Sequence, residues 1–189
     1  MTRLARIAPQ GARRIAGWLL FVCALALLPA NGVAADTQTP GAAEFTAGYF
    51  CAREPVDIGE AEGTVSGTVS FVEGLPPFLG PGPLVPGQKD VGFGVHVRAL
   101  PDYAGPVEIT IEHPPMGPNN VTSQTWYTDI SGLEAQYYGY TFDYEYEILK
   151  GQWRMTARTA AGVVYSAGFE VVDPALLPPV TCGYAVPLS

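Results

Sequence analysis

Apolar and polar residues alternate along most of the chain from residue 45 onward. The clearest run places Val91, Phe93 and Val95 on one side and His96 and Arg98 on the other. A period of two is typical of strands with one buried and one solvent-facing side. Comparable runs cover residues 45–51, 65–71, 91–99, 107–111, 121–130, 138–148, 153–158 and 163–171.

Turn residues separate these runs, for example Lys150-Gly151, Ala161-Gly162 and Asp173-Pro174. No segment of helical length after residue 44 shows the 3.6-residue period of an amphipathic helix. Strands without intervening helices predict an all-β fold, and we expect an antiparallel, immunoglobulin-like β-sandwich of about 7–8 strands. The Cys-Trp-Cys spacing of antibody domains is absent, so this likeness is one of architecture.

Residues 74–88, called here the Pro/Gly segment, are rich in proline and glycine. Proline lacks a backbone donor, so this segment cannot form the centre of a strand and is predicted to be an extended loop or a sheet edge. It also carries Phe78, Leu79, Leu84 and Val85. These apolar residues either pack across an open end of the sandwich or form a loop that binds a partner.

The first 35 residues have the pattern of a secretory signal peptide. A stretch containing Arg3, Arg6, Arg13 and Arg14 precedes the uncharged apolar run 15–30, and small residues follow at Val33-Ala34-Ala35. We therefore expect cleavage near Ala35-Asp36, no stable membrane span afterwards, and a periplasmic or secreted location. An uncleaved N-terminal anchor is the alternative.

The remaining chain is predicted to contain a flexible segment at residues 36–43, one sandwich domain at 44–173 and a proline-rich tail at 174–189. Without the first 35 residues, six basic and eighteen acidic side chains remain, which gives a formal net charge of −12. Such a charge repels phosphate, so a nucleic-acid partner is not expected.

Two cysteines remain after the leader, Cys51 and Cys182. In an oxidising compartment one disulfide between them is the simplest expectation, with two unpaired thiols as the alternative. Such a bond would tie the C-terminal tail to the start of the domain.

No motif for nucleophilic catalysis is present, and the two histidines, His96 and His113, have no nucleophile motif near them. His113 is interpreted as a strand-end residue that bonds the turn. No catalytic residue and no cofactor are predicted. Asp143, Glu145 and Glu147 are a candidate calcium site, because these acids would project from one face of the predicted strand 138–148. A face of ion pairs with Arg154 and Arg158 is the alternative, and it is favoured.

Aromatic residues are concentrated between Trp126 and Tyr146. Most belong to the predicted buried side, but exposed aromatic side chains on a sandwich bind sugars and anchor protein interfaces. The candidate binding surface consists of Trp126, Tyr127, Tyr137, Phe78 and Leu79.

Several strings in the second half of the chain carry a resemblance to a known family. They are His113-Pro114-Pro115, residues 121–126, 139–143, 146–153 and 169–172, together with 64–71 and 92–97. Over residues 45–173 the chain resembles an uncharacterised family of small secreted proteobacterial domains of unknown function. The resemblance implies a bacterial source and a β-sandwich, and it implies no activity.

Three functions remain open on this basis. The favoured one is a non-enzymatic binding or accessory module for an envelope protein or glycan. The others are a small envelope hydrolase that uses acidic residues, and a purely structural accessory domain.

Overall fold

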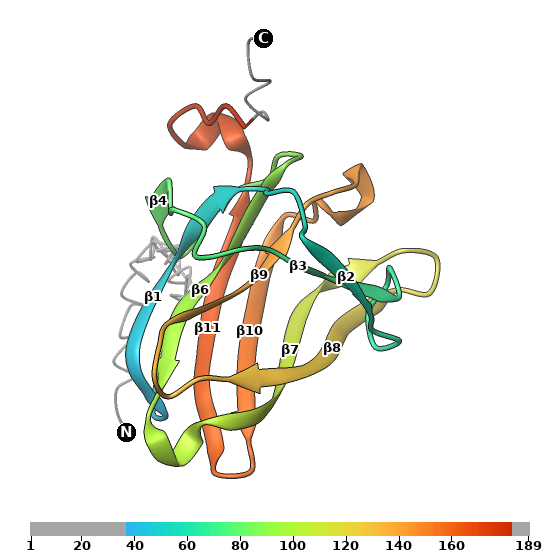
Figure 1. The fold of residues 1–189 in the computed structure, drawn as a ribbon. Helices are drawn as coiled ribbons and strands as arrows, with labels where there is room; N and C mark the ends of the chain where they lie inside the picture. The colour runs from blue at the N-terminus through green and yellow to red at the C-terminus, as the bar shows by residue number, and fades with distance from the viewer. Residues whose placement is uncertain (1–36, 183–189) are drawn as a thin grey trace, which may run out of the picture. The chain divides into compact units, whose positions relative to one another are not determined.

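The computed structural model describes residues 37–182 of the chain. This part contains three β-sheets and three short 3-10 helices (Figure 1). The four-stranded sheet has the order β4-β1-β6-β9 and the five-stranded sheet the order β5-β11-β10-β7-β8. Neighbouring strands are antiparallel, except that β5 runs parallel to β11. The third sheet is the hairpin β2-β3.

The strands of the four-stranded sheet are β4 (Gly80–Pro81), β1 (Ala42–Cys51), β6 (Val91–Ala99) and β9 (Gln136–Thr141). Those of the five-stranded sheet are β5 (Leu84–Pro86), β11 (Gly162–Val172), β10 (Gly151–Thr159), β7 (Gly105–Met116) and β8 (Val121–Ile130). The hairpin consists of β2 (Asp57–Glu60) and β3 (Thr68–Phe71), and the 3-10 helices are η1 (Pro101–Tyr103), η2 (Glu145–Glu147) and η3 (Pro174–Leu176).

The two large sheets pack face to face around one apolar core, which confirms the predicted β-sandwich. Phe93 of β6 lies at its centre, with ring centroids 4.7 Å from Phe169 of β11 and 5.4 Å from Trp153 of β10. In β10 the predicted alternation holds, since Met155 is fully buried between the outward-facing residues Arg154 and Thr156. One side of each sheet is therefore core, and the other is left for solvent or a ligand.

The Pro/Gly segment forms one edge strand of each large sheet. Its residues Gly80–Pro81 pair with β1, and Leu84–Pro86 pair with β11, so the segment passes from one sheet to the other. Val85 is fully buried in the core. Of the two predicted alternatives for the segment, the sheet edge is confirmed, whereas Leu79 and Leu84 remain exposed.

Two predicted strands are shorter than the alternation indicated. The run 138–148 leaves the sheet after Thr141 and continues into η2, and the run 65–71 is a strand only from Thr68. In the first case Glu147 turns inward, where its Oε2 accepts hydrogen bonds from the backbone N–H groups of Asp143 and Tyr144 at 2.8 and 2.9 Å. A local side-chain bond to the backbone competes here with strand pairing.

Both ends of the described region are attached to the sandwich. Cys51 and Cys182 form the predicted disulfide, with Cα atoms 5.3 Å apart. Gln38 forms a bridge with Ser166 of β11, and the N–H of Gly41 donates to Val164 O at 3.0 Å, so part of the segment predicted as flexible is held by hydrogen bonds.

The predicted signal peptide, residues 1–35, lies outside the described residues, as does the end of the tail beyond residue 182. Within residues 37–182, no helix has the length and apolar character needed to span a membrane.

Candidate functional site

The outer face of the five-stranded sheet carries a regular array of polar side chains. Strand register places Arg158 opposite Glu108 and Arg154 opposite Glu112, with Thr156 opposite Thr110 between the two pairs. A period of two along each strand directs all six side chains to the same side of the sheet. The predicted face of Arg154 and Arg158 with residues 143–147 is therefore wrong, because the acids opposite these arginines come from β7.

A row of hydroxyl groups crosses the middle of this face. Thr110 Oγ1 and Thr125 Oγ1 are 3.1 Å apart, and Thr156 Oγ1 and Ser166 Oγ are 3.2 Å apart. Arg154 Nη1 donates to Ser166 Oγ at 3.1 Å. These bonds fix the side chains relative to one another, so the face presents donors and acceptors at set positions.

Tyr127 of β8 stands at the edge of the array with 75% of its surface exposed. It lies opposite Glu108, and its hydroxyl donates a hydrogen bond of 2.8 Å to Glu108 Oε2. This hydrogen bond, followed by the negative charge of Glu108, raises the pKa of the Tyr127 hydroxyl. The bond holds the hydroxyl and leaves the ring open to solvent.

A depression of about 220 Å³ lies next to this tyrosine on the same face. Its lining residues are Glu108, Thr110, Glu112, Thr156 and Arg158. The guanidinium of Arg158 makes no hydrogen bond or ion pair to another side chain within residues 37–182. The depression therefore offers two carboxylates, two hydroxyls and an accessible guanidinium to one ligand.

The residues predicted as a single binding surface are divided between different parts of the molecule. Tyr127 is exposed on the five-stranded sheet, whereas the neighbouring Trp126 points the other way and packs against the core. Tyr137 and Phe78 lie on the outer side of the four-stranded sheet, where they contact His96 and Phe50. The predicted contiguous patch is therefore not formed.

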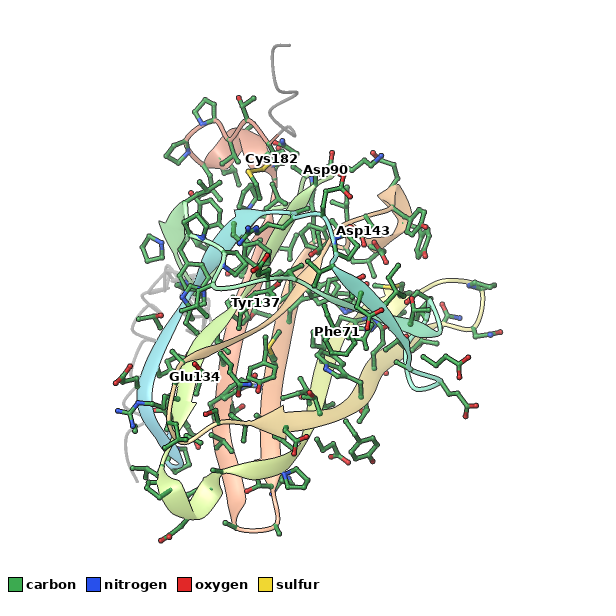
Figure 2. The ribbon with its side chains drawn as sticks, viewed as in Figure 1. Phe71, Asp90, Glu134, Tyr137, Asp143 and Cys182 are labelled. Atoms are coloured by element: carbon green, nitrogen blue, oxygen red, sulfur yellow. A yellow bond between two sulfur atoms is a disulfide. The ribbon has the colours of Figure 1, made fainter. Side chains whose placement is uncertain are left out.

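On the outer side of the four-stranded sheet, aromatic rings cover a strip without side chains. Gly48, Gly94 and Gly139 lie in register across β1, β6 and β9. The ring of Phe78 lies over this strip, since a Cβ added at Gly48 would be 2.7 Å from Phe78 Cγ. Tyr137, labelled in Figure 2, lies over Gly139 in the same way. Leu79, in contrast, is 50% exposed.

His96 was predicted to face solvent, but Phe78 covers it. The two rings are stacked, with centroids 4.1 Å apart and planes 19° from parallel. Burial lowers the pKa of His96, although a hydrogen bond with the Pro76 backbone acts in the opposite direction. Its Nε2 is buried without a hydrogen-bond partner in the described part of the chain. The alternation predicted an exposed His96, and this is wrong because Phe78 of the Pro/Gly segment covers the ring.

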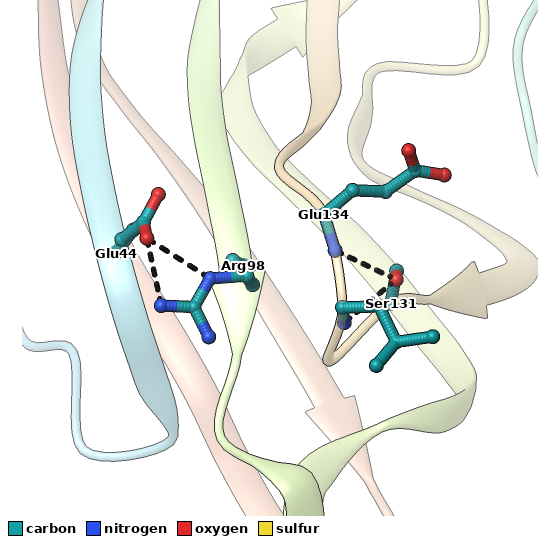
Figure 3. A network of polar contacts seen from close by, with 5 residues as sticks. Glu44, Arg98, Ser131 and Glu134 are labelled. Atoms are coloured by element: carbon teal, nitrogen blue, oxygen red, sulfur yellow. Dashed lines mark hydrogen bonds and ion pairs between the residues drawn. The ribbon is translucent and has the colours of Figure 1, made fainter.

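Farther along the outer side of the four-stranded sheet, the polar side chains are engaged in an ion pair and in hydrogen bonds within a turn. Arg98 donates from Nη2 and Nε to Glu44 Oε1 at 2.7 and 3.0 Å. The hydroxyl of Ser131 accepts the backbone N–H groups of Leu133 and Glu134 at 3.0 and 3.2 Å (Figure 3). Arg98 already has a carboxylate partner, so this side offers less to a polar ligand than the five-stranded sheet.

A buried polar network was missed from the sequence. Gln124 Nε2 donates to His113 Nε2 at 3.1 Å, and Gln124 Oε1 accepts the Val65 N–H at 2.7 Å. The other ring nitrogen of His113 lies 2.8 Å from Pro114 O. Both residues lie within β7, which continues to Met116, so the prediction of a strand-end histidine is wrong. Burial lowers the pKa of His113. These atoms are hydrogen-bonded to one another, and none of the partners is a nucleophile.

Glu147 is the third buried polar residue, and its position removes the calcium candidate. Besides its two backbone bonds, its Oε1 accepts the Tyr140 hydroxyl at 3.2 Å. Burial raises the pKa of this carboxyl, although these hydrogen bonds favour the charged form. Asp143 and Glu145 remain exposed, so the three acids do not share a face. Within the described residues, no group of three or more His, Cys, Asp or Glu side chains is arranged to hold a metal ion.

Comparisons with known proteins identify a family and assign no activity. A family model described as "Domain of unknown function (DUF3859)" matches residues 45–171. A crystal structure of an immunoglobulin-like protein (PA1606) from Pseudomonas aeruginosa aligns with a TM-score of 0.46 and 16% identity, and covers 75% of this chain and 100% of that one. No curated protein sequence matches the chain.

Proposed function

The chain belongs to the DUF3859 family of domains of unknown function, and from this premise we propose that it is a non-enzymatic, immunoglobulin-like module of the bacterial cell envelope that binds a glycan. The observation that carries the proposal is the polar depression beside the exposed ring of Tyr127 on the five-stranded sheet. The predicted signal peptide and the disulfide support an envelope location, since disulfides persist in oxidising compartments.

The chemistry of this face suits a sugar. Pyranose rings present hydroxyl groups at their edges and apolar C–H groups on their faces. The carboxylates of Glu108 and Glu112 accept hydrogen bonds from hydroxyls, and Arg158 donates them. The open ring of Tyr127 provides an apolar surface on which a sugar ring can stack. A small number of fixed polar groups beside an aromatic ring is a common design for ligand recognition.

A glycan is favoured over a protein at this face for two reasons. The residues that line the depression are charged or hydroxylated, whereas the centre of a protein interface is depleted in charge. The polar side chains of neighbouring strands on this face also follow one another about 4.8 Å apart, which is the spacing of strands in a sheet. Each unit of a sugar chain that lies across the strands could contact the polar side chains of one strand.

Strand geometry argues against glycoside hydrolysis at the same place. Glu108 and Glu112 are four residues apart on β7, so their Cα atoms are separated by roughly 13 Å in an extended strand. Glycosidases hold their two carboxyl groups about 5–9 Å apart. The two side chains would have to bend toward each other to reach that separation, whereas the Glu108 carboxylate is held by the Tyr127 hydroxyl of the neighbouring strand. The pair therefore suits binding along an extended ligand better than attack on one bond.

A glycan array of bacterial polysaccharides, combined with isothermal titration calorimetry on any hit, tests this proposal. We expect saturable binding that Tyr127→Ala weakens about five- to tenfold, because one aromatic contact contributes roughly 1 kcal/mol. Leu133→Ser, at a residue 95% exposed elsewhere, should bind as the wild type does.

Binding that is unaffected by both Tyr127→Ala and Arg158→Ala would reject this face as the site. Turnover of chromogenic glycosides or esters, lost on changing one acid, would favour the hydrolase instead.

A further inference from the structure

An exposed aromatic pair lies at η2, in the connection between β9 and β10, with Tyr146 inside η2 and Tyr144 directly before it. The rings of Tyr144 and Tyr146 are stacked, with centroids 5.4 Å apart and planes 11° from parallel. Their exposed fractions are 56% and 46%. Each ring covers one face of the other, so the pair presents its outer faces and edges to solvent.

The backbone beneath this pair is fixed by buried groups. Glu147, on the inner side of the same turn, accepts hydrogen bonds from the N–H groups of Asp143 and Tyr144 and from the hydroxyl of Tyr140. Tyr140 in turn packs on Trp153, with ring centroids 5.2 Å apart. The turn is thus anchored to the core, and a partner would pay little conformational entropy to order it.

The electrostatic surroundings of the pair are negative. Asp143 and Glu145, which flank Tyr144 in the sequence, are both exposed. Partial desolvation of the Asp143 carboxyl by its neighbours raises its pKa first, Asp90 raises it further, and Lys89 is the cation that opposes this. Burial first, and then the charge of Glu147, raises the pKa of the Tyr146 hydroxyl. A cation brought to this turn would therefore meet both ring faces and carboxylates.

We infer that the tyrosine pair at η2 is a docking site for an arginine side chain of a partner protein. Cations are attracted to aromatic ring faces, and the planar guanidinium stacks on them more readily than an ammonium group does. Asp143 and Glu145 supply the complementary charge. A second copy of this chain is disfavoured as the occupant, because the domain carries a net charge of −12 after the leader and would repel itself.

This site is separate from the proposed glycan surface, and its residues lie on a different element. The chain would then bind a sugar at the face of its five-stranded sheet and a protein at the turn of η2, and so could connect the two. Failure of either proposal leaves the other standing, because the variants that test them do not overlap.

The test uses the purified protein and a labelled short peptide with two arginines in a glycine–serine sequence. The control peptide has citrulline, which is uncharged and nearly isosteric, in place of arginine. Binding is measured by fluorescence anisotropy at low and at physiological salt, because exposed charge interactions weaken as salt rises. We expect the arginine peptide to bind more tightly than the citrulline peptide.

The variants separate aromatic recognition from simple charge attraction. Tyr144→Ser/Tyr146→Ser keeps the net charge, and we expect it to raise the dissociation constant about fivefold or more, given typical cation–π contributions. Tyr144→Phe/Tyr146→Phe keeps the ring faces and should bind like the wild type, as should Leu133→Ser. Equal affinity of the serine variant and the wild type would overturn the inference, and so would equal binding of the two peptides.

Discussion

His113, Gln124 and Glu147 are the polar residues that the core buries, and each is held by hydrogen bonds. Gln124 joins two parts of the molecule, since it bonds both His113 of β7 and the backbone of Val65 in the loop of the β2-β3 hairpin. Buried polar groups are costly when one partner is removed. The protonation states of His113 and Glu147 are therefore linked to the stability of the fold.

The lowered pKa of His113 makes a prediction about acid stability. Burial favours the neutral imidazole, so the folded-state pKa lies below the ordinary value of 6.5. Between these two values the unfolded chain binds more protons, and stability falls as the pH drops below 6.5. We expect urea denaturation from pH 7.5 to 5.5 to show this loss, and His113→Gln to reduce the slope.

The wild type must be compared with His113→Gln, because other groups stabilise the folded state as the pH falls. The pKa values of Glu147 and Asp143 are raised, so their protonation favours the folded state as the pH falls. His96 has a lowered pKa and adds to the loss. If His113→Gln had the same slope as the wild type, the imidazole of His113 would not be protonated on unfolding in this range.

The strands of the two large sheets were largely predictable, because most of them bury one side. β10 follows the predicted parity. In β6 the glycines Gly92 and Gly94 of the other side are buried as well, and in β11 Val164 is buried instead of the predicted Val163. Prediction failed where the chain leaves the sheet while the alternation continues. The apolar parity from Tyr138 to Ile148 does not reveal that Glu147 turns inward and ends the strand.

The candidate site was predicted only in part, for a related reason. Parity separates Trp126 from Tyr127, but it does not tell which of two adjacent side chains faces the core. Parity also does not show which sheet a strand joins. Tyr137 lies in the four-stranded sheet, whereas Tyr127 lies in the five-stranded sheet. The polar depression depends on the pairing of β7 with β10, a long-range contact that no local pattern specifies.

Close packing of β6 against β9 leads to a prediction for Gly94. A Cβ at this position would collide with the carbonyl oxygen of Tyr138 and lie 2.7 Å from the Cα of Gly139. Both are backbone atoms of a paired strand and cannot rotate away. We expect Gly94→Ala to lower the free energy of unfolding by about 1–3 kcal/mol, the usual cost of overpacking. Thermal unfolding followed by circular dichroism measures this, and an unchanged midpoint would contradict it.

At the scale of the whole molecule, the disulfide connects the beginning of the sandwich to its last described residue. Val180 and Cys182 pack against the core, and Gln88 Nε2 donates to Val180 O at 3.3 Å. The tail is therefore held at several points over the end of the sandwich where the Pro/Gly segment leaves β5. The covalent link fixes this arrangement in a chain whose net negative charge works against compactness.

Removal of this bond should destabilise the protein. The bridge spans 131 residues, and closing so long a loop restricts the unfolded chain strongly. We expect Cys51→Ser/Cys182→Ser to lower the free energy of unfolding by about 2–4 kcal/mol, the typical range for a native disulfide. Urea denaturation with and without reductant measures the effect. Reductant should shift the wild type to the midpoint of the variant and leave the variant unchanged, because the variant has no bond to break. A wild type that is insensitive to reductant and as stable as the variant would show that tail packing alone holds this end of the fold.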